Sequence, residues 1–156
     1  MKNQKIQQEA DKMRIIPFQD QFRDDMIFMI LEAKNALGRV PGLNDDLLDI
    51  QSNYFNKGDM FWIAVDEQNR VIGSVGFHAD ITVAKADLHR LFVKFNRKRQ
   101  GIGSALLNTA EDHLKARQVK TIYVHLGNGE EWFESRLFYT KHGFTEYATD
   151  KMKKEI

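Results

Sequence analysis

The chain has no cysteine among its 156 residues. A disulfide framework, a thiolate nucleophile and a cysteine metal site are therefore excluded. The chain does have five histidines, but their spacing is not that of metal ligands. They are His78, His89, His113, His125 and His142. We therefore expect no bound metal.

Long apolar runs and an excess of charge of one sign are also missing. No run is long enough for a membrane helix. The formal net charge is only +1, which argues against a dedicated nucleic-acid binder, although residues 94–99 are locally basic. Residues 1–12 are polar and lack the apolar stretch of a signal peptide, so we expect a cytoplasmic protein with a polar leader. With 42% apolar and 29% charged residues, the remaining 13–156 are expected to form one domain.

The order of apolar patterns along the chain predicts a mixed α/β fold. We expect strands near 14–18, 61–65, 71–80, 84–93, 121–126 and 144–152, and helices over 19–38, 44–58, 102–117 and 130–142. Asn44 is a suitable N-cap for the second of these helices. No repeat, linker or low-complexity segment interrupts this order.

A basic loop with two glycines joins the expected strand 84–93 to the expected helix 102–117. It reads Arg97-Lys98-Arg99-Gln100-Gly101-Ile102-Gly103-Ser104. Glycines let a backbone approach a phosphate, and the first N–H groups of a helix lack intrahelical partners. The loop therefore predicts a site for a ligand with a pyrophosphate group.

Two common phosphate-binding motifs do not fit this loop. A Walker loop ends in Gly-Lys-Ser/Thr, whereas Gly103 is followed by Ser104-Ala105. A dinucleotide fingerprint has a third glycine where this chain has Leu106.

A second informative segment lies near the C-terminus. It reads Ser135-Arg136-Leu137-Phe138-Tyr139-Thr140-Lys141-His142-Gly143-Phe144. Phe133, Leu137 and Phe138 stand at helical spacing, Gly143 is a suitable helix C-cap, and Phe144 begins the next strand.

Together the two segments resemble the GNAT N-acetyltransferase superfamily over about residues 60–150. The coenzyme A loop of that family reads Arg/Gln-x-x-Gly-x-Gly/Ala, and Lys98 stands at its Arg/Gln position, which keeps the charge but loses the guanidinium fork. The resemblance implies a central, mostly antiparallel twisted sheet with a splayed parallel pair, flanked by about four helices. It also implies acetyl-CoA as the cofactor.

The resemblance implies a set of cofactor contacts. Backbone groups of the strand before the loop would hold the pantetheine arm, and the loop would hold the pyrophosphate. The residues are Leu91, Phe92, Val93, Lys98, Arg99, Gln100, Gly101, Ile102, Gly103 and Ser104. Trp132 replaces an asparagine that is common in the family, so Asn128 is a candidate for the missing amide, and Arg136 is a candidate for a phosphate contact.

The resemblance also implies catalytic roles. Tyr139 matches the tyrosine that protonates the departing sulfur, since a phenol with a pKa of about 10 is protonated at neutral pH. Asp87 and His89 are candidates for the general base, and alternation places both on one face of their strand. Ordered water is an alternative to either side chain. Trp132 and Phe133 are candidates for the cofactor arm, the substrate mouth or the core.

We expect the acceptor to bind against the first two helices and the hairpin. Candidate lining residues are Asp45, Asp46, Tyr54, Phe55, Trp62 and His78. The predicted function is transfer of an acetyl group from acetyl-CoA to a primary amine, on a small molecule or a peptide, by direct attack. A homodimer is one alternative for the assembly. A non-catalytic acyl-CoA-binding module and a binder of another phosphorylated ligand remain alternatives.

Overall fold

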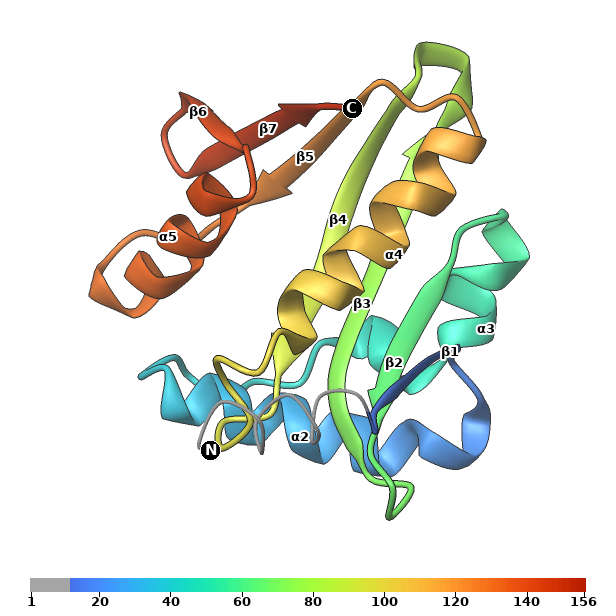
Figure 1. Ribbon diagram of the computed structural model, residues 1–156, viewed down its shortest axis with the longest axis vertical. Helices are drawn as coiled ribbons and strands as arrows, with labels where there is room; N and C mark the ends of the chain where they lie inside the picture. The colour runs from blue at the N-terminus through green and yellow to red at the C-terminus, as the bar shows by residue number, and fades with distance from the viewer. Residues whose placement is uncertain (1–11) are drawn as a thin grey trace.

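The computed structural model describes residues 12–156, so the predicted leader falls almost wholly outside it. Its centre is a seven-stranded sheet in the order β1-β2-β3-β4-β5-β7-β6 (Figure 1). The strands are β1 (Arg14–Pro17), β2 (Phe61–Val65), β3 (Val71–Asp80), β4 (Lys85–Val93), β5 (Thr121–His125), β6 (Thr145–Ala148) and β7 (Lys151–Glu155). Neighbouring strands are antiparallel except for the β4–β5 pair, as the resemblance implied.

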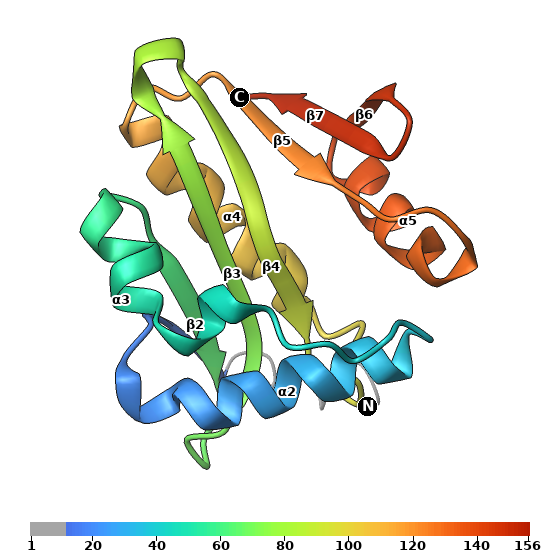
Figure 2. The ribbon, with the colours of Figure 1, turned by 180° about the vertical axis from the view of Figure 1, so that it is seen from behind.

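Helices cover both faces of the β2–β4 part of the sheet (Figures 1 and 2). These helices are α2 (Arg23–Ala36), α3 (Ile50–Asn53) and α4 (Ile102–Ala116), whereas α5 (Phe133–Lys141) lies beside β5, β7 and β6. The apolar stripe of α4 is fully buried against one face through Leu106, Leu107 and Leu114. α2 crosses the opposite face and buries Met26 and Ile30 in a second apolar cluster. The sheet is thus the middle layer of three.

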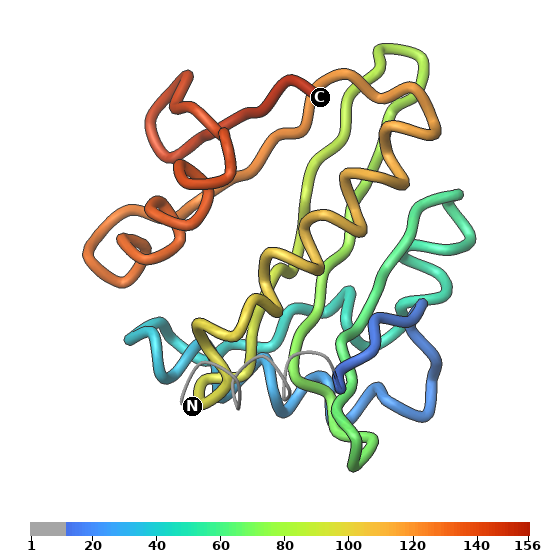
Figure 3. Tube along the Cα trace, in the orientation of Figure 1, coloured from blue at the N-terminus to red at the C-terminus, as the bar shows by residue number. Residues whose placement is uncertain are grey.

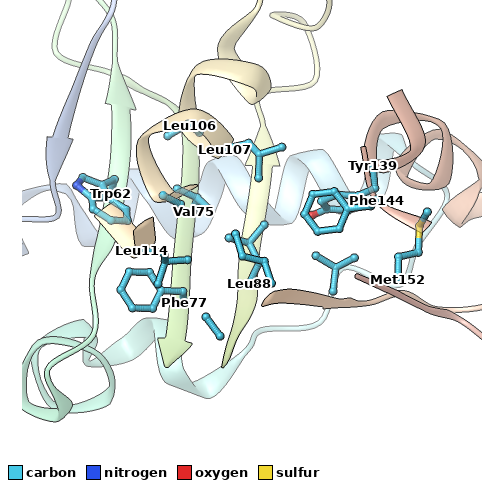
Figure 4. Packing of buried hydrophobic residues seen from close by; sticks show 14 of the residues in the cluster. Trp62, Val75, Phe77, Leu88, Leu106, Leu107, Leu114, Tyr139, Phe144 and Met152 are labelled. Atoms are coloured by element: carbon cyan, nitrogen blue, oxygen red, sulfur yellow. The ribbon is translucent and has the colours of Figure 1, made fainter. Parts of the chain in front are cut away.

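β4 and β5 pair over only three positions and then diverge. Their register runs Lys85↔Thr121, Ala86↔Ile122 and Asp87↔Tyr123. Beyond Asp87, β4 remains paired with β3, whereas β5 remains paired with β7, which in turn pairs with β6. The two parts of the sheet diverge from this point (Figure 3). α5 lies on this second side, where Tyr139 packs beside Phe144 and Met152 (Figure 4).

A β-bulge alters the second half of β4. Gly76 pairs with His89 and Ser74 with Phe92, so Arg90 and Leu91 together oppose Val75 alone. Arg90 adopts a left-handed φ of +55°, and its carbonyl accepts a 2.7 Å hydrogen bond from Ser74 Oγ. As a result His89 and Arg90, though adjacent, both face the α2 side.

Two predicted elements were wrong. The strand expected over 144–152 is two strands, β6 and β7, joined by a turn in which Asp150 has a φ of +59°. The helix expected over 44–58 is broken into η2 (Asp45–Leu48), α3 and η3 (Phe55–Lys57). Asn44 stands at the N-cap position of η2, but its side chain makes no capping hydrogen bond, because its Oδ1 accepts a 2.6 Å hydrogen bond from Lys34 Nζ. Asp49 caps α3 instead, accepting from the Ser52 N–H.

Within residues 12–156 no helix is long and apolar enough to cross a membrane. The same part of the chain holds no group of three or more His, Asp or Glu side chains arranged to bind a metal ion.

Candidate functional site

A cavity of about 590 Å³ lies where the end of β4, the glycine loop, α5 and the last turn of α2 meet. Most of the predicted cofactor residues line it: Leu91, Phe92, Val93, Lys98, Arg99, Gly101, Ile102, Gly103 and Ser104. Gln100, Asn128 and Arg136 do not line it. The divergence of β4 from β5 therefore places the end of β4, the loop and α5 around one space.

The two glycines of the loop are needed for different structural reasons. Gly101 is the N-cap of α4 with a φ of +81°, and an added Cβ there would meet no atom within 4 Å. It is required by backbone conformation. Gly103 would place a Cβ 3.3 Å from Phe138 and 3.4 Å from Val93. It is required by the close approach of α4 to α5 and β4.

The cavity wall is basic. Arg39, Arg97, Lys98, Arg99 and Lys141 all line it. Arg97 pairs with Asp66 at 3.3 Å and Lys98 pairs with Glu134 at 2.9 Å. The other three make no ion pair within residues 12–156, so the wall carries positive charge without a balancing carboxylate. Such a wall favours an anionic ligand.

Tyr139 reaches the cavity from α5. Its side chain is 8% exposed and packs edge-on against the rings of Phe138 and Phe144. Its hydroxyl makes no hydrogen bond to another residue in the described part of the chain, although the residue lines the cavity. Burial raises the pKa of Tyr139, against a smaller lowering by Arg39, so the phenol is protonated at neutral pH.

His142 joins α5 to α4 at the cavity, which both His142 and Ser104 line. Its Nδ1 lies 2.7 Å from the Phe138 carbonyl and its Nε2 lies 2.8 Å from Ser104 Oγ. A carbonyl can only accept, so Nδ1 carries the proton and Nε2 accepts from the serine hydroxyl. This contact links residues 38 positions apart, and no sequence pattern predicts it.

The two candidate bases lie outside the cavity lining. Asp87 is half exposed, and its carboxylate is 3.9 Å from His125 Nε2. The ring of His89 stands edge-on to that of His78, with 4.7 Å between centroids. Burial, with smaller contributions from His78 and Arg90, lowers the pKa of His89 to about 4. His89 is therefore neutral at neutral pH, and it is a weak base.

Beside His89 lies a polar cluster of Tyr54 and His78, which were predicted acceptor-side residues, and Asp59, which was not. Asp59 is 6% exposed and accepts hydrogen bonds from the His78 ring at 2.8 Å and from the Ala79 N–H at 3.0 Å. The Tyr54 ring stacks on His78 with 4.6 Å between centroids. Because Asp59 accepts from Nδ1, the Nε2 atom of His78 is left as the basic nitrogen.

A second polar group ties η2 to the bulge of β4. Asp46 accepts hydrogen bonds from Arg90, at 3.0 Å to Nη2, and from the Tyr54 hydroxyl at 2.5 Å. Burial works to raise the pKa of Asp46, but these hydrogen bonds outweigh it and hold the pKa below its usual value. Asp46, Tyr54 and His78, three of the predicted acceptor-side residues, thus lie together.

Other predicted acceptor-side residues lie elsewhere. Trp62 is buried on the α4 face of the sheet, so it cannot line the α2 side. Asp45 is exposed, and Phe55 packs against the α2 cluster.

The region around Trp132 has a structural explanation. Trp132 occupies the space above Gly127, where an added Cβ would lie 2.1 Å from the indole nitrogen. Phe133 beside it is 62% exposed. Arg136 donates to the Gly127 carbonyl at 3.0 Å and pairs with Asp150, which fixes the β6–β7 turn to α5. Asn128 is exposed.

Comparison with known proteins agrees with this arrangement. The family model described as "Acetyltransferase (GNAT) domain" matches residues 57–146, so the chain belongs to the GNAT acetyltransferase family. A search of curated proteins found no match.

Solved structures show the same fold at low sequence identity. A GNAT-family acetyltransferase from Staphylococcus aureus Mu50 has a TM-score of 0.79 at 22% identity, covering 92% of this chain and 98% of its own. The PaiA N-acetyltransferase from Thermoplasma acidophilum, in complex with coenzyme A, has a TM-score of 0.70 at 18% identity, covering 92% and 99%. A GNAT-family acetyltransferase from Brucella melitensis, in complex with acetyl-CoA, has a TM-score of 0.66 at 16% identity, covering 92% and 88%.

Proposed function

We propose that this protein transfers an acetyl group from acetyl-CoA to a primary amine by direct attack. The amine nitrogen bonds to the thioester carbon, the C–S bond breaks, and the products are an N-acetyl amine and coenzyme A. The observation that carries the proposal is the basic cavity of about 590 Å³ at the divergence of β4 and β5. Structures of family members with coenzyme A or acetyl-CoA support the choice of donor.

The residues present fit the two ends of that donor. Gly101 and Gly103 leave the start of α4 without side chains that would block a pyrophosphate, and Arg99 and Lys141 add unpaired positive charge nearby. Leu91 and Val93 offer backbone groups at the end of β4, past the last pairing with β5. Bound acetyl-CoA would supply the activated acyl group.

Protons must move at two atoms in this reaction. Tyr139 faces the cavity with a protonated hydroxyl and is the proposed donor to the departing sulfur. The amine must lose a proton, and Asp87, His89 or ordered water is the proposed acceptor. The lowered pKa of His89 makes it a weaker acceptor than an ordinary histidine.

A thermal-shift titration tests the choice of ligand. We expect acetyl-CoA to raise the melting temperature, with little effect of NAD or ATP at the same concentration, because at a hundredfold excess over Kd a ligand stabilises the fold by about 2.7 kcal/mol. Release of coenzyme A thiol would then be screened over a panel of amines. An equal or larger shift with NAD or ATP would contradict the proposal.

A non-catalytic acyl-CoA-binding module is the second candidate. It is favoured by one observation, that neither Asp87 nor His89 lines the cavity. Such a module would bind acetyl-CoA in the thermal-shift titration and release no thiol with any amine. The predicted cytoplasmic location and homodimer remain predictions.

A further inference from the structure

One positive charge in the cavity has no role in the scheme above. Arg39 lines the wall formed by the segment after α2, opposite α5, and it is half-buried. Some arginines of this fold pair with aspartates, as Arg70 does with Asp25 and Arg90 with Asp46. Arg39 makes no ion pair within residues 12–156. Its positive charge is therefore available to a ligand that carries negative charge.

The backbone before Arg39 fixes its position. α2 ends in a Schellman motif, in which Gly38 has a φ of +79° and donates to the Asn35 carbonyl at 3.0 Å. The Arg39 N–H donates to the Lys34 carbonyl at 3.0 Å. Arg39 therefore leaves the helix at a defined point and in a defined direction.

Neutral groups hold the side chain. Nε donates to the Glu131 carbonyl at 3.2 Å and Nη2 donates to Ser135 Oγ at 2.8 Å. The guanidinium lies over the Trp132 ring, 3.5 Å from its centroid. These contacts orient the charge without neutralising it, and Gly127 is what lets Trp132 occupy this place.

Arg39 and Tyr139 line the same cavity, and Arg39 is hydrogen-bonded to Ser135, which lies one helical turn before Tyr139 on α5. In keeping with this position, Arg39 opposes the effect of burial on the pKa of Tyr139. The other charged groups facing Arg39 are Glu131 and Glu134 from η5 and α5, and Lys34 from α2. Both glutamates are exposed, and Glu134 is engaged by Lys98.

We propose that the guanidinium of Arg39 faces the departing sulfur of coenzyme A and stabilises the negative charge that forms there. This inference rests on the proposed function. When the C–S bond breaks, its electron pair stays on sulfur. Arg39 holds the resulting thiolate until Tyr139 delivers a proton, and the phenolate regains its proton from solvent. Trp132, Ser135 and the Glu131 carbonyl are positioning groups for this cation.

The thiol pKa of bound coenzyme A tests this assignment without an acceptor. Thiolate absorbance would be titrated in the wild-type complex and in Arg39→Gln, with the desulfo-coenzyme A complex as reference to remove tyrosine ionisation. The protein has no cysteine, so the thiolate signal comes from the ligand alone. We expect the thiol pKa to be about one unit lower in the wild type than in Arg39→Gln, because an opposite charge nearby favours the ionised form.

Two further variants separate charge at the sulfur from other effects. Arg99→Gln removes one cation from the glycine loop and should weaken coenzyme A binding without moving the thiol pKa. Arg39→Lys keeps the charge but loses the planar contact with Trp132, and it should restore part of the shift. It also covers the case in which Arg39→Gln does not fold.

The outcomes distinguish this inference from the proposed function. If coenzyme A fails to bind the wild type, the proposed function fails. If it binds and the thiol pKa is the same in the wild type and Arg39→Gln, Arg39 has a structural role only. An equal shift in Arg99→Gln would also overturn the assignment, since it would show a general effect of the basic wall.

Discussion

At the scale of single residues, the hydroxyl of Tyr139 is the group most directly tied to the proposed chemistry. Tyr139→Phe removes the donor and keeps the ring packed against Phe138 and Phe144. We expect turnover to fall about 100-fold, within the range of one general acid, with the Kd for acetyl-CoA nearly unchanged. Steady-state kinetics and calorimetric titration measure the two effects. An unchanged kcat would remove Tyr139 from the mechanism.

Gly101 is a residue whose backbone conformation alone can be tested. Gly101→Ala adds a Cβ in open space at a φ of +81°, so only backbone strain opposes it. We expect the free energy of unfolding to fall by about 1–2 kcal/mol, measured by urea denaturation. Gly42→Ala is the matched control, because that position is equally open and its φ is not in the left-handed region. Equal losses in both variants would refute the explanation.

His89 predicts a pH dependence of stability. Its pKa is about 4 in the folded protein and ordinarily near 6.5, so between these values the unfolded chain binds the proton more readily. Stability from this group is complete above pH 6.5 and is lost as the pH falls toward 4. Between pH 7 and 4.5 we expect the free energy of unfolding of His89→Gln to fall by about 2 kcal/mol less than that of the wild type. This value allows for partial solvent screening. Parallel pH curves in urea denaturation would contradict this.

At the scale of elements, the contact of α4 with β3 depends on a glycine. A Cβ on Gly73 would lie 2.7 Å from Leu106 Cδ1 and 3.0 Å from Ile102 Cγ2. We expect Gly73→Ala to lower the free energy of unfolding by about 1–3 kcal/mol through overpacking. The double variant Gly73→Ala, Leu106→Val should lose less free energy of unfolding than the sum of the losses of the two single variants. Strict additivity in urea denaturation would show that the helix and strand are not in the predicted conflict.

Most of these elements could be predicted because their signals are local. The glycine loop, the apolar stripe of α4 and the C-cap Gly143 lie within short stretches of sequence. The β6–β7 turn was missed, because Asp150 takes a left-handed conformation without a glycine or proline to mark it. The helix expected over 44–58 was broken because Asp49 ends η2 and caps α3.

Much of the site could not be predicted, because it depends on pairs that are distant in sequence. Arg90 and Asp46 are 44 positions apart, and Arg39 and Ser135 are 96 apart. The periodicity of apolar residues within a helix or strand does not predict contacts between such distant residues. The bulge in β4, which turns Arg90 toward Asp46, shows in the sequence only as a shift of the apolar residues from even-numbered to odd-numbered positions.

At the scale of the whole molecule, the cavity separates two parts of the sheet that touch through three register pairs. A ligand held by the glycine loop on one side and by α5 on the other would join them. We expect coenzyme A to slow hydrogen exchange in residues 97–103 and 133–141 and to leave β2 unaffected. Exchange measured by mass spectrometry, with and without coenzyme A, checks this. Uniform protection of all elements would indicate general stabilisation and not a bridge.

The bulge at Arg90 and Leu91 also changes which positions of β4 face the α4 layer. Before it, Ala86 and Leu88 contribute to the α4 layer; after it, Leu91 and Val93 do. Even-numbered positions thus give way to odd-numbered ones. Deleting one residue at the bulge would restore simple alternation. The side chains of β4 on one side of the deletion would then point to the opposite face of the sheet. An alignment of this strand with an unbulged relative therefore needs a one-residue gap, or it will assign side chains of the α4 face to the α2 face.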